Sequence, residues 1–228
     1  MDNEGYFQRT ELLLGEETMR AISRTRVLVV GTGGVGSWCA EALVRTGIGH
    51  IALVDSDLVC ASNVNRQLMA TSATIGEPKV QALARRLREI NPSAAISAIE
   101  GIYSADTAPA FNLEKYDYVI DAIDSVADKA HLIRNALSIP SVTLYSSMGA
   151  ARRLDPFRVR ATEFWKVQGD GLARALRNRF RKSGEFPARK FTCVWSDEPP
   201  RADAGTVMHV TAAFGLALAS LVVRKAQA

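Results

Sequence analysis

Four glycines between residues 31 and 36 and an aspartate at residue 55 have the types and spacing of a nucleotide-binding site. In the pattern GTGGVG, the missing side chains let backbone N–H groups approach a phosphate at the positive end of the following helix. Asp55 comes about 20 residues after the last glycine, where a carboxylate can accept hydrogen bonds from ribose hydroxyls. We predict a nucleotide site, with a plain strand-to-helix turn as the alternative. The glycines assigned to it are Gly31, Gly33, Gly34 and Gly36.

Polar and cationic side chains gather again in the stretch DSDLVCASNVNRQLMATSATIGEPK, residues 55–79. Attack of a carboxylate on the α-phosphate of ATP requires neutralisation of phosphate charge, which positioned cations provide. Arg66 and Lys79 could fulfil this role, although Arg66 could instead form a weak surface ion pair and Lys79 could decorate the first turn of a helix. A dehydrogenase that uses NAD needs none of these groups, so the stretch favours adenylation. Its polar members are Asn63, Asn65, Arg66, Gln67 and Lys79.

Two aspartates near the end of the sequence YVIDAID provide a candidate metal ligand. Mg²⁺ usually takes one or two protein carboxylates together with substrate phosphates and water. Asp121 and Asp124 are both placed to contribute, and one of them could instead cap the helix that follows. We assign Mg²⁺ to Asp124.

These candidate residues fall at the ends of predicted strands that alternate with helices. Apolar runs predict strands at residues 27–30, 50–55, 94–100, 116–122, 141–146 and 191–196. Helices are expected at residues 10–23, 37–46, 79–90, 106–112 and 126–137. Such alternation implies parallel crossover connections. We therefore predict an α/β fold with a doubly wound, mainly parallel sheet of Rossmann type, whose site lies at the carboxyl ends of the strands.

The length of 228 residues suits a single domain over residues 1–228, with a nucleotide-binding core at about 20–150 and a further segment at about 151–200. The start, MDNEGYFQRT, lacks a basic stretch followed by an apolar one, which predicts a cytoplasmic protein. The three cysteines are odd in number and far apart, so neither a disulfide framework nor a four-cysteine zinc site is expected.

The segment from residue 151 to residue 190 is strongly basic. It holds twelve Lys and Arg residues against four Asp and Glu residues, whereas the whole chain has a net charge of +4. With Phe157, Phe164, Trp165 and Phe180 interleaved, this segment is suited to bind a polyanion, for which nucleic acid is the natural candidate. A solvated basic helix without special purpose is the alternative.

The last predicted element, at about residues 207–224, is apolar nearly all round. His209, Thr211, Gly215 and Ser220 interrupt it, and it is short for a membrane span. We expect a buried or dimer-facing helix rather than a membrane contact, and no stable membrane insertion.

The motifs together resemble those of the ThiF/MoeB-type adenylating enzymes, relatives of the ubiquitin-activating enzymes. GTGGVG, DSDLVCASNVNRQ, GEPK and VIDAIDS occur in this order. Within that superfamily, FQRTELLLGEE, RTGIG, MGAARRLDP and CVWSDE are most similar to the tRNA threonylcarbamoyladenosine dehydratases. The likeness covers nearly the whole chain.

The resemblance implies an enzyme that binds tRNA carrying threonylcarbamoyladenosine beside the anticodon. Such an enzyme activates the threonyl carboxylate with ATP and Mg²⁺ and closes it into a cyclic form with net loss of water. The glycines would then line the phosphates and Asp55 the ribose, while Asp57 and Asn63 form a polar wall. Arg66 and Lys79 would neutralise phosphate charge. Asp124 would hold Mg²⁺.

The resemblance also implies partners. Arg9, in FQRT, matches an arginine that enters the ATP site of the other subunit in related adenylating enzymes, which implies a homodimer; in a flexible chain start it could equally lie in solvent. The basic segment would bind the tRNA, and a sulfur-transfer protein is a further candidate partner. The alternative functions are adenylation of the C-terminus of a ubiquitin-like sulfur carrier, and nucleotide binding without catalysis.

Two features are less readily interpreted. Cys193, in FTCVWS, could accept an acyl group as cysteines do in ubiquitin-type activation, but we favour a packed strand thiol because a nucleophile within the substrate can close the ring. The chain is also shorter than the subfamily pattern between Glu198 and Thr206, which implies a trimmed loop with an effect on substrate affinity.

Overall fold

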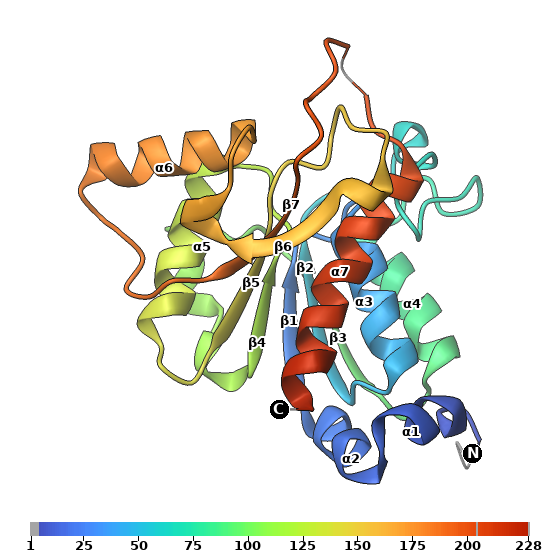
Figure 1. Ribbon diagram of the computed structural model, residues 1–228. Coiled ribbons are helices and arrows are strands. Elements are labelled where there is room, and N and C mark those ends of the chain that lie inside the picture. The colour runs from blue at the N-terminus through green and yellow to red at the C-terminus, as the bar shows by residue number, and fades with distance from the viewer. Residues whose placement is uncertain (1–4, 204, 228) are drawn as a thin grey trace.

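The computed structural model describes residues 5–203 and 205–227 and contains a seven-stranded sheet with helices on both faces (Figure 1). The strand order is β3-β2-β1-β4-β5-β7-β6, and every neighbouring pair runs parallel except β6 with β7. The predicted doubly wound, mainly parallel sheet is confirmed. The strands are β1 (Arg26–Val30), β2 (His50–Asp55), β3 (Ala95–Glu100), β4 (Tyr118–Asp121), β5 (Thr143–Ser147), β6 (Val159–Glu163) and β7 (Thr192–Ser196).

The helices form two layers around this sheet (Figure 1). One face is covered by α3, α4 and α7, and the other by α5 and α6, while α1 and α2 lie beyond the amino ends of the strands. At the other end of the sheet, the carboxyl ends of the strands border a cavity that can receive a ligand. The helices are α1 (Gln8–Leu14), α2 (Glu16–Arg24), α3 (Gly36–Thr46), α4 (Lys79–Ile90), α5 (Val126–Ser138), α6 (Gly171–Ser183) and α7 (Met208–Ala226).

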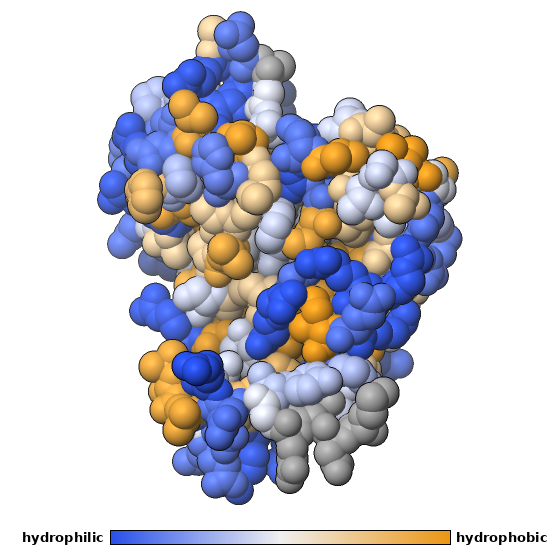
Figure 2. All heavy atoms as spheres, turned by 90° about the vertical axis from the view of Figure 1, so that its right-hand side faces the viewer, coloured by the Kyte–Doolittle hydropathy of each residue, from blue (hydrophilic) through white to orange (hydrophobic). Residues whose placement is uncertain are grey.

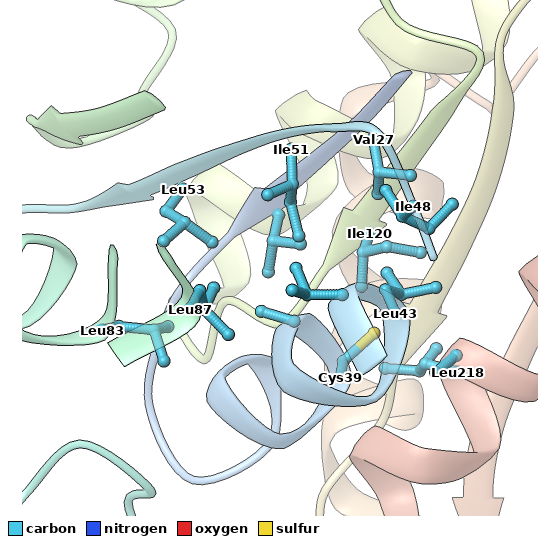
Figure 3. Packing of buried hydrophobic residues seen from close by; sticks show 14 of the residues in the cluster. Val27, Cys39, Leu43, Ile48, Ile51, Leu53, Leu83, Leu87, Ile120 and Leu218 are labelled. Atoms are coloured by element: carbon cyan, nitrogen blue, oxygen red, sulfur yellow. The ribbon is translucent and has the colours of Figure 1, made fainter. Parts of the chain in front are cut away.

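The apolar run of β1 supplies both layers of the core. Val27 and Val29 belong to the cluster under α3, α4 and α7, whereas Leu28 and Val30 belong to the cluster under α5 and α6. Successive strand residues point to opposite faces, so a strand buried on both faces must be apolar throughout. Figure 3 shows the first of these clusters, where side chains of α3, α4 and α7 pack against the strands.

The final helix, α7, is part of this core. Its Gly215 lies so close to α3 that an added Cβ would come within 2.5 Å of the carbonyl oxygen of Val35 and 2.8 Å of the backbone nitrogen of Cys39. By length and composition α7 could cross a membrane, but its buried face packs against α3 and the sheet, as in a core helix. The structure therefore agrees with the expected buried helix.

Two predicted helices differ from the observed elements, and one observed strand was not predicted. The helix expected at residues 10–23 is divided into α1 and α2 at Gly15, whose φ of 82° ends the first helix. The helix expected at 106–112 is only a 3₁₀ turn, Ala108–Ala110, with a proline in its first turn. Strand β6 was not predicted, because as an edge strand it is mostly half-buried or exposed and lacks an apolar run.

Candidate active site

A cavity of about 540 Å³ opens at the carboxyl edge of the sheet, over the ends of β1, β2, β4 and β5. It lies where an open parallel sheet binds ligands, at the point where the strand order reverses on either side of β1. Nearly all of the predicted nucleotide residues line it. They are Gly31, Gly33, Gly34, Asp55, Asp57, Asn63, Arg66, Gln67, Lys79 and Asp124.

The glycine-rich turn closes the bottom of the cavity. Gly31 has a φ of 88°, and a Cβ there would come within 2.7 Å of the carbonyl oxygen of Ala122. Gly36 does not line the cavity: its own Cβ would lie 1.9 Å from the carbonyl oxygen of Gly31, so this glycine lets the start of α3 pack onto the turn. The structure thus gives Gly36 a packing role where the sequence predicted a phosphate contact.

Asp55 at the end of β2 is tied to the same turn. Its Oδ2 accepts hydrogen bonds from the backbone nitrogen and the hydroxyl of Thr32, at 2.7 and 3.0 Å. Its Oδ1 accepts one from the backbone nitrogen of Asp57 at 3.0 Å. These bonds fix the carboxylate at the cavity wall, while a carboxylate has lone pairs for further donors such as ribose hydroxyls.

Lys79 is held as a buried cation at the cavity. Its Nζ donates to Oδ2 of Asp57 at 2.6 Å and lies 4.0 Å from Oδ1 of Asp55. Only 7% of its side chain is exposed, although it begins α4. Burial of a lysine requires compensating anions, which the two carboxylates supply. The alternative that Lys79 is only a surface residue in the first turn of its helix is therefore wrong.

Arg66 and Gln67 form the wall above the glycines. The carbon stem of Arg66 lies over Gly34, where a Cβ would meet it at 3.3 Å, and Trp38 of α3 donates from Nε1 to the Arg66 carbonyl at 2.9 Å. Gln67 is buried, and its Oε1 has no hydrogen-bond partner among the residues that the structure describes. Since Gln67 lines the cavity, this unpaired buried amide oxygen is the kind of group that a ligand donor satisfies.

The two candidate metal aspartates have opposite environments. Asp121 is fully buried and accepts from Nζ of Lys129 at 2.9 Å and from the hydroxyl of Ser146 at 2.7 Å. Asp124 is exposed and lines the cavity, and no described residue pairs with its carboxylate. Neither caps α5, whose N-cap is Ser125. Of the two, only Asp124 is free to meet a ligand.

The donor set at Asp124 fits Mg²⁺ rather than a metal held by protein alone. Within the described ranges, no group of three or more His, Cys, Asp and Glu side chains is placed to hold a metal. Mg²⁺ keeps several waters and takes few protein ligands when substrate phosphates complete its shell. Asp128, which also lines the cavity, receives a hydrogen bond from Ser125 at 2.7 Å and was not predicted.

The far wall of the cavity was also missed by sequence reasoning. It consists of the segment after β5, residues 149–151, together with Leu172 in the first turn of α6. Asp170 joins the two: its side chain accepts from the backbone nitrogen of Ala173 at 2.8 Å and from that of Gly149 at 3.2 Å. The sequence signals for this wall are the motif MGAARRLDP, which includes residues 149–151, and an Asp before a helix.

Arg9 lies on α1, outside the cavity and at the opposite end of the strands (Figure 1). It is exposed to solvent. Within one chain it therefore takes no part in the site, and its predicted role depends on a second subunit.

The cysteines and the aromatic residues of the basic segment are mostly structural. Cys193 is fully buried on β7, and burial raises the pKa of its thiol from 9.0 to about 12, which leaves it protonated and a poor nucleophile. Phe164 and Phe180 are fully buried in the core, whereas Phe157 and Trp165 are 94% and 36% exposed. The idea that all four aromatic side chains face a polyanion is therefore wrong for the first two, Phe164 and Phe180, which pack in the core cluster that also contains the buried face of α6.

Residues 7–226 match the ThiF family, and the chain belongs to that family. Within it, the chain is similar to the tRNA threonylcarbamoyladenosine dehydratases. It is 41% identical to the dehydratase of Bacillus subtilis over 194 residues, which cover 85% of this chain and 75% of that protein. It is 40% identical to that of Escherichia coli over 220 residues, which cover 90% and 79%.

The fold gives the same relationship. The structure superposes on that of the Escherichia coli dehydratase in complex with ATP with a TM-score of 0.90, at 37% identity over 97% of this chain and 93% of the other. The same relative has been solved in complex with AMP. The resemblance inferred from the motifs is thereby confirmed.

Proposed function

We propose that this protein uses ATP to adenylate the carboxylate of threonylcarbamoyladenosine in tRNA and releases a cyclic product with net loss of water. The observation that carries this proposal is the meeting of a phosphate-binding turn, two cations and one unpaired carboxylate in a single cavity. Its dehydratase relatives support the substrate, and the structures of the Escherichia coli relative with ATP and with AMP support the nucleotide.

The chemistry needs two displacements. An oxygen of the substrate carboxylate attacks the α-phosphorus, and pyrophosphate leaves. A nucleophile within the same substrate then attacks the acyl carbon, and AMP leaves. No protein nucleophile is required, which agrees with the protonated, buried thiol of Cys193.

In this scheme the protein positions groups and balances charge. The glycine-rich turn receives the phosphates and Asp55 the ribose. Lys79 and Arg66 offset negative charge that develops during pyrophosphate release. Asp124 would hold Mg²⁺, which would withdraw negative charge from the phosphates.

We further propose a homodimer in which Arg9 of one subunit reaches the cavity of the other. On the same helix, α1, Leu12 and Leu13 are 83% and 81% exposed, which is unusual for large apolar side chains. Figure 2 shows apolar side chains exposed on the side of the molecule where α1 and α4 lie. We place the activity in the cytoplasm, with tRNA as substrate.

The test is incubation with ATP, Mg²⁺ and tRNA that carries threonylcarbamoyladenosine, followed by mass analysis of the released nucleosides. We expect the modified nucleoside to lose one water while AMP and pyrophosphate form. An unchanged nucleoside, with pyrophosphate released only when a ubiquitin-like carrier protein is added, would contradict the proposal and identify a protein C-terminus as substrate.

A further inference from the structure

The twelve cations of residues 151–190 divide into two groups in the structure. Half of them are engaged by the protein itself. Arg153, for example, lies buried against Asp170, and Arg189 donates to four carbonyl groups in the last turn of α5 and the segment that follows it. The engaged side chains are Arg152, Arg153, Arg158, Arg160, Arg177 and Arg189.

The other cations form no contact with the described residues that stabilises the fold. Their side chains are exposed, and among the described residues no acid, carbonyl or aromatic ring binds them. Folding alone does not account for their presence in one stretch of chain, since unpaired like charges repel one another. They are Lys166, Arg174, Arg179, Arg181, Lys182 and Lys190.

Four of these free cations lie on α6, which contains no acidic residue. At 3.6 residues per turn, Arg174, Arg181 and Lys182 fall on the side of the helix opposite to its buried residues. The helix therefore presents a strip of positive charge to solvent. The buried residues are Ala173, Leu176 and Phe180.

Among these cations, the position of Arg174 gives the strongest indication of an anionic ligand. It is the fourth residue of α6, near the end at which the helix dipole already places positive charge. A cation there is unfavourable for the helix by itself, unlike Arg181 and Lys182 in the last turn, which the dipole favours. An anionic ligand at the start of α6 would offset this cost.

The start of α6 is fastened to the active-site cavity. Asp170 caps the helix and binds the backbone nitrogen of Gly149, and both Gly149 and Leu172 line the cavity. From this point the helix runs outward (Figure 1), and its 13 residues at 1.5 Å each extend over about 20 Å. A polynucleotide backbone that follows the strip of positive charge on α6 therefore leads directly into the cavity.

We propose that the exposed face of α6, defined by Arg174, Arg181 and Lys182, is the docking surface for the tRNA backbone next to the modified nucleotide. This inference rests on the proposed function for the identity of the substrate. The surface reads phosphates and not bases, because the aromatic residue of α6, Phe180, is buried and the exposed strip consists of cations. The RNA lies along α6 with the modified nucleotide at the helix start.

The experiment compares tRNA binding by the wild-type protein and the triple variant R174A/R181A/K182A across a series of salt concentrations. Each phosphate contact that is lost reduces the slope of log affinity against log salt by about 0.7 to 0.9, so the slope should fall by about 2 to 3. The affinity at moderate salt should fall about tenfold or more. ATP binding, measured in parallel, should stay unchanged because none of the three side chains lines the cavity.

A matched control removes the same charge at the other end of the molecule. Arg24, Lys115 and Lys225 are exposed, and the variant R24A/K115A/K225A should keep the wild-type slope and affinity. Loss of tRNA affinity in this control to the same extent would show that only net charge matters and would overturn the proposal. The proposal would also be overturned if the α6 variant kept the wild-type salt dependence of tRNA binding. It would be overturned as well if the α6 variant lost binding to a ubiquitin-like carrier while its tRNA binding persisted.

Failure of the proposed function gives a different result. In that case the wild-type protein leaves threonylcarbamoyladenosine unchanged in the nucleoside assay and does not bind tRNA. This result overturns both proposals. Failure of the docking surface alone leaves wild-type cyclisation intact and the α6 variant equally active at low tRNA concentration.

Discussion

At the scale of single residues, the contrast between Asp121 and Asp124 shows how two similar carboxylates take different roles. Asp121 is neutralised by Lys129 in the interior, where loss of one partner of a buried pair costs about 3 to 5 kcal/mol. Asp124 is exposed at the cavity, so its carboxylate carries no desolvation penalty that a partner would have to offset. The first aspartate stabilises the protein, and the second remains available for chemistry.

We expect D124A to lower the rate of AMP formation by at least about 100-fold, because the carboxylate that would hold Mg²⁺ at the phosphates is lost. The melting temperature should not change. The matched control is D106A, since Asp106 is another exposed aspartate but does not line the cavity. Normal turnover by D124A, or an equal loss in D106A, would remove Asp124 from the mechanism.

Cys193 gives the opposite prediction: C193A should retain ring closure at close to the wild-type rate. The reason is that a thiol whose pKa is raised to about 12 by burial carries almost no thiolate at neutral pH. Trapping of an acyl-enzyme on this cysteine would contradict the expectation.

The same raised pKa makes stability fall in alkali. Between the ordinary thiol pKa of 9.0 and about 12, the unfolded chain has lost the proton that the folded protein keeps, so the folded state is disfavoured as the pH rises. From pH 8 to pH 10, the free energy of unfolding of C193A should fall by about 1 kcal/mol less than that of the wild type. Urea unfolding at the two pH values measures this difference.

At the scale of elements, the glycine-rich turn depends on the close approach of α3 to the end of β1. G36A should disrupt both stability and ATP binding, because a Cβ would collide with a backbone carbonyl at 1.9 Å and not with a flexible side chain. As a control, G171A at the start of α6 meets nothing within 4 Å and should stabilise the protein by about 0.4 to 1 kcal/mol. Denaturant unfolding and ATP titration of both variants check the prediction, and wild-type ATP affinity in G36A would contradict it.

At the scale of the whole molecule, the site is incomplete in one chain if Arg9 acts across a dimer. R9A and D124A should each be inactive, but a mixed dimer contains one cavity with both wild-type groups. Random mixing of equal amounts should restore about a quarter of the wild-type sites. Activity of R9A alone, or a mixture as inactive as its components, would show that Arg9 does not complete a partner's cavity.

Sequence alone determined the local parts of this protein. The apolar runs, the glycine spacing and Asp55 predicted the strands, the turn and the cavity edge, because these depend on the period of side chains and on residues close in the chain. The predicted cavity residues therefore came together as expected, with Gly36 as a packing residue instead. The basic segment was recognised by its charge.

Only the tertiary structure decided which residues of each kind are free. It placed Lys129 against Asp121 and left Asp124 open, it buried Cys193, Phe164 and Phe180, and it separated the engaged cations of the basic segment from the exposed ones of α6. The physical reason is that burial and pairing join residues far apart in the chain, whereas a sequence pattern records residue types and leaves their environments undefined.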